Sequence, residues 1–228
     1  MTARGISHCV PPKMKTLTPL GRIALTIAIA LPFSLGSIHA QTSLDFVAFE
    51  TSGVSDLDDL NFIDLNALIT ATAGGVSIQI QNNSNIGDPS ITPSTPTVTR
   101  IFFEDQAGVL GDSVSIVSSS PGVSFVRNDG AHLPGGNTIG FDVDTAFTAA
   151  SPLSKNGLDP SESVIFLFNG TVYDALVASI VSGNFRIAMH VQEIGPCGSD
   201  SAAFVSVPEP GTTVLALLGM AILLRRRR

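Results

Sequence analysis

The sequence predicts an all-β protein: a single β-sandwich with one short helix, flanked by an N-terminal signal helix and a C-terminal transmembrane helix. Three observations indicate this class. Short runs alternate apolar with polar residues, turn-forming segments separate them, and an uncharged apolar stretch lies near each end of the chain. We therefore expect a signal peptide over residues 1–40, a β domain over residues 41–206 and a membrane-directed segment over residues 207–228.

The N-terminal region has the composition of a secretory leader. Basic residues ending at Arg22 precede an apolar run over residues 23–35, and a small residue, Ala40, follows it at a position suited to signal peptidase. We expect export through the Sec translocon and cleavage after Ala40. Met14 is an alternative start, and the two apolar ends could instead be two permanent membrane spans.

The central region is long enough, at about 165 residues, for one domain with its own core. Residues 76–81 alternate strictly, with Val76, Ile78 and Ile80 on one face, and therefore predict a half-buried strand. Similar runs predict strands at residues 44–50, 67–73, 98–103, 113–117, 123–127, 138–143, 163–168, 185–191 and 203–205. Gly74 and Gly75 predict a hairpin turn, and the spacing of apolar residues predicts one helix over residues 172–181.

The charge of the central region excludes nucleic-acid binding. Residues 41–209 hold four basic residues against nineteen acidic ones, a formal net charge of −15. Nucleic-acid binding depends on Lys and Arg that neutralise phosphates, so an acidic surface of this kind repels DNA and RNA.

Candidate catalytic groups are few. His132 and His190 are the histidines left after the leader, and alternation puts His190 on the polar face of its strand, as a surface residue. Cys197 has no second cysteine in the mature chain with which to pair. No nucleophile elbow, zinc helix or nucleotide loop is present. We therefore expect no enzyme activity, no catalytic residues, no cofactor and no metal site.

Two binding functions remain as alternatives. The acidic cluster at residues 56–61 with Asp64 could offer oxygens to Ca²⁺, although the glycine and terminal glutamate of an EF-hand are missing. Sugar sites commonly stack a ring on Trp or Tyr, yet this chain has no Trp and one Tyr, Tyr173. Phe102, Phe125, Phe166 and Phe168 lie in predicted strands and are assigned to the core.

The last twenty-two residues combine three ordered parts. Val207, Pro208, Glu209 and Pro210 form an extended, protease-accessible turn, because proline fixes φ and lacks an N–H. An apolar run over residues 211–224 follows, and Arg225, Arg226, Arg227 and Arg228 hold the end in the cytoplasm. The run would span ~21 Å of a ~30 Å hydrocarbon core, a length also typical of a buried helix. Snorkelling arginines favour the membrane.

This tail resembles the PEP-CTERM sorting signal of exosortase-processed bacterial proteins. The resemblance implies export, insertion into membrane lipid, recognition by the membrane-embedded exosortase, and release to the cell surface or exterior, often with exopolysaccharide. Three further segments, residues 133–137, 156–163 and 185–192, resemble a recurrent β-rich ectodomain of such proteins that has no assigned activity.

From these observations we expect an exported, exosortase-sorted surface or matrix-associated structural protein. The alternative is a calcium-dependent or exopolysaccharide-binding adhesin, and a secreted hydrolase is third.

Overall fold

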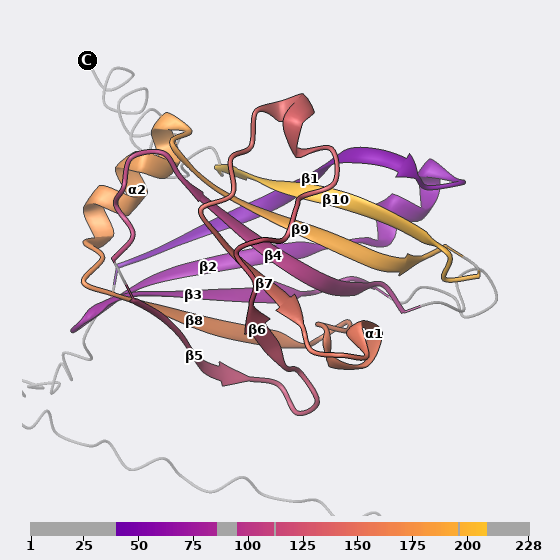
Figure 1. The fold of residues 1–228 in the computed structure, drawn as a ribbon, viewed down its shortest axis with the longest axis horizontal. Helices are drawn as coiled ribbons and strands as arrows, with labels where there is room; N and C mark the ends of the chain where they lie inside the picture. Colours follow the sequence, from indigo (N-terminus) through magenta and orange to yellow (C-terminus); the bar gives the residue numbers. More distant parts are fainter. Residues whose placement is uncertain (1–39, 86–94, 112, 196, 209–228) are drawn as a thin grey trace, which may run out of the picture. The chain divides into compact units, whose positions relative to one another are not determined.

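Ten antiparallel strands form one continuous sheet in the part of the chain that the structure describes (Figure 1). The structure is a computed structural model that describes residues 40–85, 95–111, 113–195 and 197–208. In chain order, with η marking a 3₁₀ helix, the elements are β1 (Gln41–Gly53), η1 (Leu57–Phe62), β2 (Leu65–Thr72), β3 (Gly75–Asn82), β4 (Thr97–Asp105), β5 (Ser113–Ser119), β6 (Phe125–Arg127), η2 (Gly136–Ile139), β7 (Thr145–Ala149), α1 (Leu153–Asn156), β8 (Ser163–Asn169), α2 (Tyr173–Ser182), β9 (Phe185–Ile194) and β10 (Asp200–Pro208). The all-β class predicted from the sequence is confirmed.

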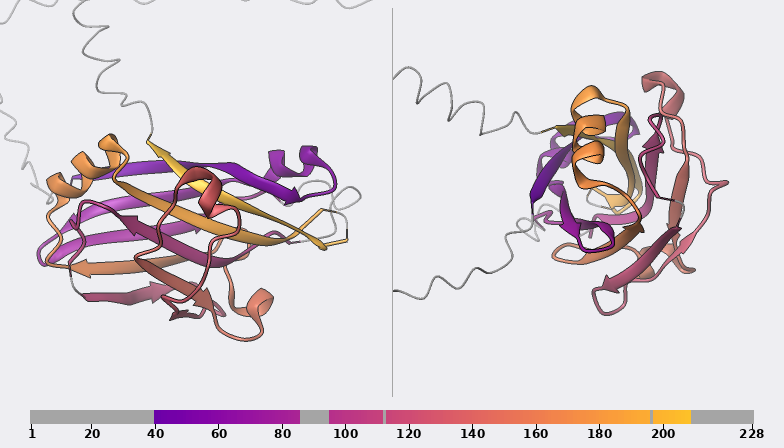
Figure 2. Two further views of the ribbon diagram at one scale, coloured as in Figure 1. Left: turned by 45° about the horizontal axis from the view of Figure 1, so that its top comes forward. Right: turned by 90° about the vertical axis from the view of Figure 1, so that its left-hand side faces the viewer.

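The sheet curls so that its two halves face each other across an aromatic core. The strand order is β5-β8-β3-β2-β1-β10-β9-β4-β7-β6, which puts five strands between β8 and β4. In a flat sheet these two strands would lie roughly 29 Å apart. The ring of Phe103 on β4 nevertheless lies 5.5 Å from that of Phe166 and 5.2 Å from that of Phe168, both on β8. The right-hand view of Figure 2 looks roughly along the strands and shows how the sheet curls.

This architecture differs from the predicted two-sheet sandwich. The last strand, β10, pairs with β1 on one side and with β9 on the other, and so joins the two halves into one ladder. Alternation along each strand sets which face is buried, and a sandwich and a curled sheet bury the same face. The difference lies in the pairing of β1 with β10, which no local pattern encodes.

The inner face of the sheet carries the main core. Val76, Ile78 and Ile80 are fully buried there, as their alternation predicts. The phenylalanines assigned to the core from the sequence are also buried: Phe102, Phe125, Phe166 and Phe168. Of these, Phe102 belongs to a second, smaller cluster with Ala188 and Ala203 on the outer face.

A long connection between β6 and β7 covers this outer cluster. A strand was predicted at residues 138–143, and this prediction is wrong. Gly135 and Gly140 adopt left-handed φ values of 66° and 59° on either side of η2, so the backbone turns there instead of extending. The alternation of Ile139, Phe141 and Val143 arises because all three pack on the outer cluster. The strand that follows, β7, was not predicted.

The turn and helix predictions are close to the structure. Thr72 pairs with Gly75, so the β2–β3 hairpin turns at Ala73 and Gly74, one residue earlier than expected. The predicted helix at residues 172–181 is α2, which ends at Ser182 and is capped by Gly183 with φ 77°. The short elements η1 and α1 were not predicted.

The two predicted terminal helices fall outside the described residues, as do all of the proposed signal peptide except Ala40 and all of the C-terminal apolar run. Within the described ranges, no helix is long and apolar enough to cross a membrane.

Candidate functional sites

The first candidate is the place where the folded chain meets its two termini. Pro208, the last residue of β10, pairs with Leu44 on β1, and Val207 pairs with Asp45. Because β1 begins at Gln41, the expected cleavage point after Ala40 and the start of the Pro-Glu-Pro motif lie at the same end of two adjacent strands.

The other residues of the predicted sorting signal lie outside the described residues: Glu209, Pro210, Arg225, Arg226, Arg227 and Arg228.

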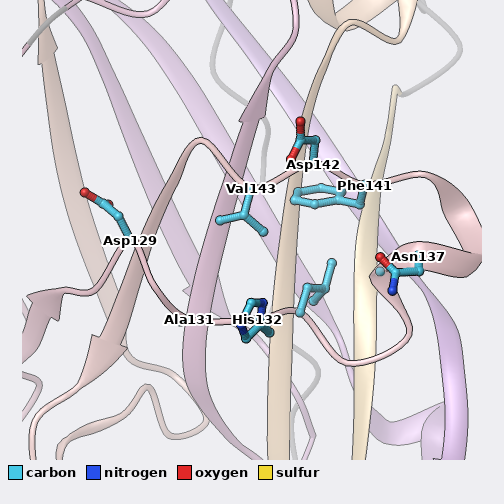
Figure 3. A pocket seen from close by; sticks show the side chains of 9 residues that line it. Asp129, Ala131, His132, Asn137, Phe141, Asp142 and Val143 are labelled. Carbon is cyan, nitrogen blue, oxygen red and sulfur yellow. The ribbon is translucent and has the colours of Figure 1, made fainter.

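A pocket of about 340 Å³ opens on the outer-face connection (Figure 3). It is lined by Asp129, Ala131, His132, Leu133, Gly136, Asn137, Phe141, Asp142 and Val143. The carboxylate of Asp129 is already engaged, since it accepts hydrogen bonds from Arg127 Nε at 2.8 and 3.0 Å and from Ala146 N at 3.3 Å. These nine residues include amide, imidazole and carboxylate groups but no hydroxyl, thiol or amine nucleophile. The pocket can hydrogen-bond a small polar ligand.

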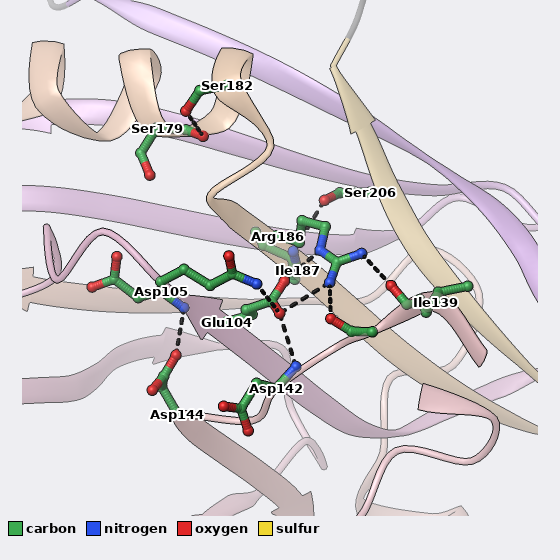
Figure 4. Close-up of polar contacts among 12 residues, drawn as sticks. Glu104, Asp105, Ile139, Asp142, Asp144, Ser179, Ser182, Arg186, Ile187 and Ser206 are labelled. Atoms are coloured by element: carbon green, nitrogen blue, oxygen red, sulfur yellow. Dashed lines mark hydrogen bonds and ion pairs between the residues drawn. The ribbon is translucent and has the colours of Figure 1, made fainter. Parts of the chain in front are cut away.

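A buried ion pair anchors this connection to the sheet (Figure 4). Glu104 on β4 is fully buried, and Arg186 opposite it on β9 donates from Nε and Nη2 to its two carboxylate oxygens. The same guanidinium donates to the carbonyls of Ile139 at 3.1 Å and Gly140 at 2.7 Å. The guanidinium carbon of Arg186, Cζ, lies 5.2 Å from the ring centre of Phe141, a cation–π distance. Arg186 therefore ties η2 to the outer face.

The electrostatics of Glu104 follow from these contacts. Burial by itself raises the pKa of this carboxyl, but the hydrogen bonds from Arg186, Asp142 N and Gln106 together outweigh burial and hold the pKa below its ordinary value. Sequence reasoning missed the pair, although a carboxylate in the apolar strand 101–104 requires a partner and residues 41–209 offer four basic residues.

A second charged cluster lies at the opposite end of β1 from Gln41. Asp59, in η1, is 9% exposed, and its Oδ2 accepts no hydrogen bond from any described residue. A methyl group on Gly195 would lie 2.9 Å from that oxygen and 3.4 Å from Asp200 Oδ2. Burial and the neighbouring charges of Asp56, Asp200 and Asp58 raise the pKa of Asp59.

Asp200 in this cluster is well satisfied. Its Oδ2 accepts from Ser55 N at 2.7 Å and Ser55 Oγ at 2.6 Å, and these bonds lower its pKa. The calcium hypothesis also included Asp64. Its backbone N–H donates a hydrogen bond to Ser84 Oγ at 3.0 Å. Among the described residues, no group of three or more acidic, His or Cys side chains is placed to hold a metal ion.

His190 is buried, so the prediction of a surface histidine is wrong. Its assignment to the face opposite Ile187, Met189 and Val191 is correct, but that outer face is covered and His190 is 7% exposed. Burial, with a smaller effect of Arg100, lowers its pKa to about 4. His190 is therefore neutral at pH 7. His132 and Cys197 are both exposed.

The other groups considered for binding have structural contacts. Tyr173 is half-buried, and its hydroxyl lies 2.7 Å from Thr42 Oγ1, so its ring is not presented as a sugar platform. The segment 156–163, singled out in the sequence, lies against β4 through the bridge between Leu158 and Val98.

Comparison with known proteins identifies one feature. The family described as the PEP-CTERM protein-sorting motif matches residues 206–228. The match begins inside β10 and contains every residue of the predicted sorting signal. Neither the curated proteins nor the solved structures include a match to this chain.

Proposed function

We propose that this chain, which carries the PEP-CTERM sorting motif, is exported, cut from its membrane tail by exosortase and kept at the cell surface or in the extracellular matrix as a structural protein. The observation that carries the proposal is the motif match at residues 206–228, which starts within the last strand of the folded sheet. The sorting motif therefore overlaps the end of the last strand of the β domain.

Each part of the two ends has one role in this proposal. The leader takes the chain to the Sec translocon, and signal peptidase cuts after Ala40. The apolar run at residues 211–224 enters membrane lipid, and the four terminal arginines keep the end in the cytoplasm. Exosortase then acts near Pro208, Glu209 and Pro210. The mature domain, with its surplus of acidic residues, is released into a setting rich in exopolysaccharide.

Charged side chains of the domain that bind one another support a structural role. Glu104 and Arg186 hold the outer connection, Asp129 binds Arg127, and the residues that line the pocket include no hydroxyl, thiol or amine nucleophile. An activity of the ectodomain stays unassigned in this proposal.

Three tail variants test the proposal, because the three parts act at different steps. Alanine at Pro208, Glu209 and Pro210 should leave an uncleaved, membrane-bound chain. Serine at Arg225 to Arg228 should give mixed topology. Truncation after Pro210 should secrete the domain directly.

The measurement is cell fractionation with an antibody against the β domain, with Thr212→Ser/Thr213→Ser as a control that keeps all three parts. Unchanged size and location in all three variants would show that the tail is not a sorting signal.

A calcium-dependent adhesin is the second candidate, and Asp59 favours it. A nine-tenths buried carboxylate oxygen without a donor, next to a second carboxylate, is a site where a divalent cation would relieve repulsion. Melting of the full chain in detergent should then rise in about 5 mM Ca²⁺, a concentration suited to weak extracellular sites. Asp59→Asn should abolish the rise and Asp64→Asn should keep it. Equal melting with Ca²⁺ and with EGTA would exclude this candidate.

A further inference from the structure

The end of β10 lies very close to the start of the apolar tail. Two residues, Glu209 and Pro210, separate Pro208 from the apolar run that begins at Gly211. An extended chain covers at most about 3.5 Å per residue, so Pro208 stays within about 10 Å of that run. When the run is in the bilayer, the surface around Pro208 must face the lipid headgroups.

Helix α2 lies beside that end of the sheet. At its first residue, the hydroxyl of Tyr173 lies 2.7 Å from Thr42 Oγ1, on the strand that pairs with the end of β10. At its other end, Ile180 and Val181 line a hollow of about 200 Å³ together with Ser206 of β10. Both ends of the helix are therefore beside the exit of the chain, and Figures 1 and 2 show α2 at this end of the sheet.

The exposed side of α2 is poor in charge and carries mostly small or apolar residues. Leu176 and Ile180 are buried and fix the helix on the sheet. Val172, the residue that precedes the helix, is 63% exposed and Val181 is 73% exposed. Ala175 and Ala178 are also exposed, and so are Ser182 and Asp174, the one charged residue of the helix. A surface helix normally presents charged side chains to water, so this face suits a less polar environment.

We propose that Val172, Ala175, Ala178 and Val181, named here the α2 face, rest on the surface of the phospholipid bilayer while the precursor is anchored. This inference rests on the proposed function, because the tail is what brings the face to the membrane. The helix has ten residues, too few to cross a bilayer, and lies along the interface.

The contact would orient the precursor for processing. The short tether holds the α2 face at a high effective concentration next to lipid, so a small apolar patch is sufficient to dock. Docking keeps Pro208 at the depth of the headgroups, where a membrane-embedded protease can reach the motif. Cleavage removes the tether, and the patch alone is too small to keep the domain on the membrane.

The experiment uses the full chain in phosphatidylcholine vesicles that carry nitroxide-labelled lipid. A polarity-sensitive fluorophore is attached to Val181→Cys in a Cys9→Ser/Cys197→Ser background. Leu57→Cys is the matched control, because Leu57 is 62% exposed and apolar but lies in η1, just beyond the far end of β1. We expect a blue-shifted emission and at least twofold quenching at Val181, and a water-like, unquenched emission at Leu57.

The outcomes separate the two levels of the proposal. A chain that does not float with the vesicles would refute the membrane tail itself. A chain that floats but shows equal, water-like probes at both positions would overturn the α2 contact alone. Quenching that needs co-reconstituted exosortase would overturn lipid as the occupant. In cells, Val172→Asp/Val181→Asp should slow processing severalfold, whereas Leu57→Asp should leave its rate unchanged.

Discussion

Glu104 has no solvent-exposed surface, and Arg186 on the neighbouring strand compensates its charge. Removing the guanidinium would leave a buried carboxylate unpaired and free the carbonyls of Ile139 and Gly140. Arg186→Met should therefore lower the free energy of unfolding by about 3 kcal/mol, measured by urea denaturation. Arg127→Met is the control, because its pair with Asp129 is about half exposed and is worth about 1 kcal/mol or less. Equal effects of the two changes would refute the role of the buried pair.

His190 gives the fold a specific pH dependence. Its pKa is depressed from 6.5 to about 4, so the folded state binds the proton less readily than the unfolded chain. The stability that His190 contributes is complete above pH 6.5 and is lost as the pH falls towards 4, up to about 3 kcal/mol.

Denaturation curves between pH 7 and pH 4 should show that loss, and His190→Gln should flatten it. Exposed His132→Gln should keep the slope of the unchanged chain. The same slope in both variants would mean that His190 is not the group responsible.

At the scale of elements, the β2–β3 hairpin contains two glycines with different constraints. A Cβ on Gly75 would meet the backbone oxygen of Phe168 at 2.1 Å, whereas one on Gly74 would meet nothing within 4 Å. Gly75→Ala must therefore push β3 away from β8 and should cost about 2 kcal/mol or more in thermal unfolding. Gly74→Ala should cost less than about 1 kcal/mol. Similar melting of the two would show that these strands are not so closely apposed.

A charge introduced into the core of the sheet should destabilise the fold more than either glycine substitution. Ile78 and Ile187 are fully buried on the inner face, and an aspartate at either position would place an unpaired charge there. Its cost of several kcal/mol compares with a total stability of ~5–15 kcal/mol. Ile187→Asp should prevent folding, and a circular dichroism melt like that of the unchanged chain would contradict this placement.

The elements also show how far the sequence predicts the fold. Alternation in residues 76–81 identified β3, because an inner core and a polar outer face leave a period of two. The same logic failed at residues 138–143, where Ile139, Phe141 and Val143 alternate while packing as a loop on the outer cluster. The pairing of β1 with β10 joins residues far apart in the chain, so one curled sheet could not be told from two stacked sheets.

At the scale of the whole molecule, the sorting motif could be predicted because it is a linear segment whose parts act in order. The buried pair of Glu104 with Arg186 and the approach of Asp59 to Asp200 depend on the fold and were not predicted. The structure adds that the first strand and the last strand pair, so the start of β1 and the end of β10 lie at one end of the sheet.

The mass of the mature protein tests this account most directly. The full chain should be expressed in two otherwise identical hosts, one with exosortase and one without, and the intact mass of the protein measured in each cell fraction. With exosortase, we predict an extracytoplasmic protein that begins near Gln41 and ends near Pro208 to Pro210. Without exosortase, the protein should stay in the membrane and retain Arg225 to Arg228. The same mass in both hosts, with the arginines present, would contradict the sorting function.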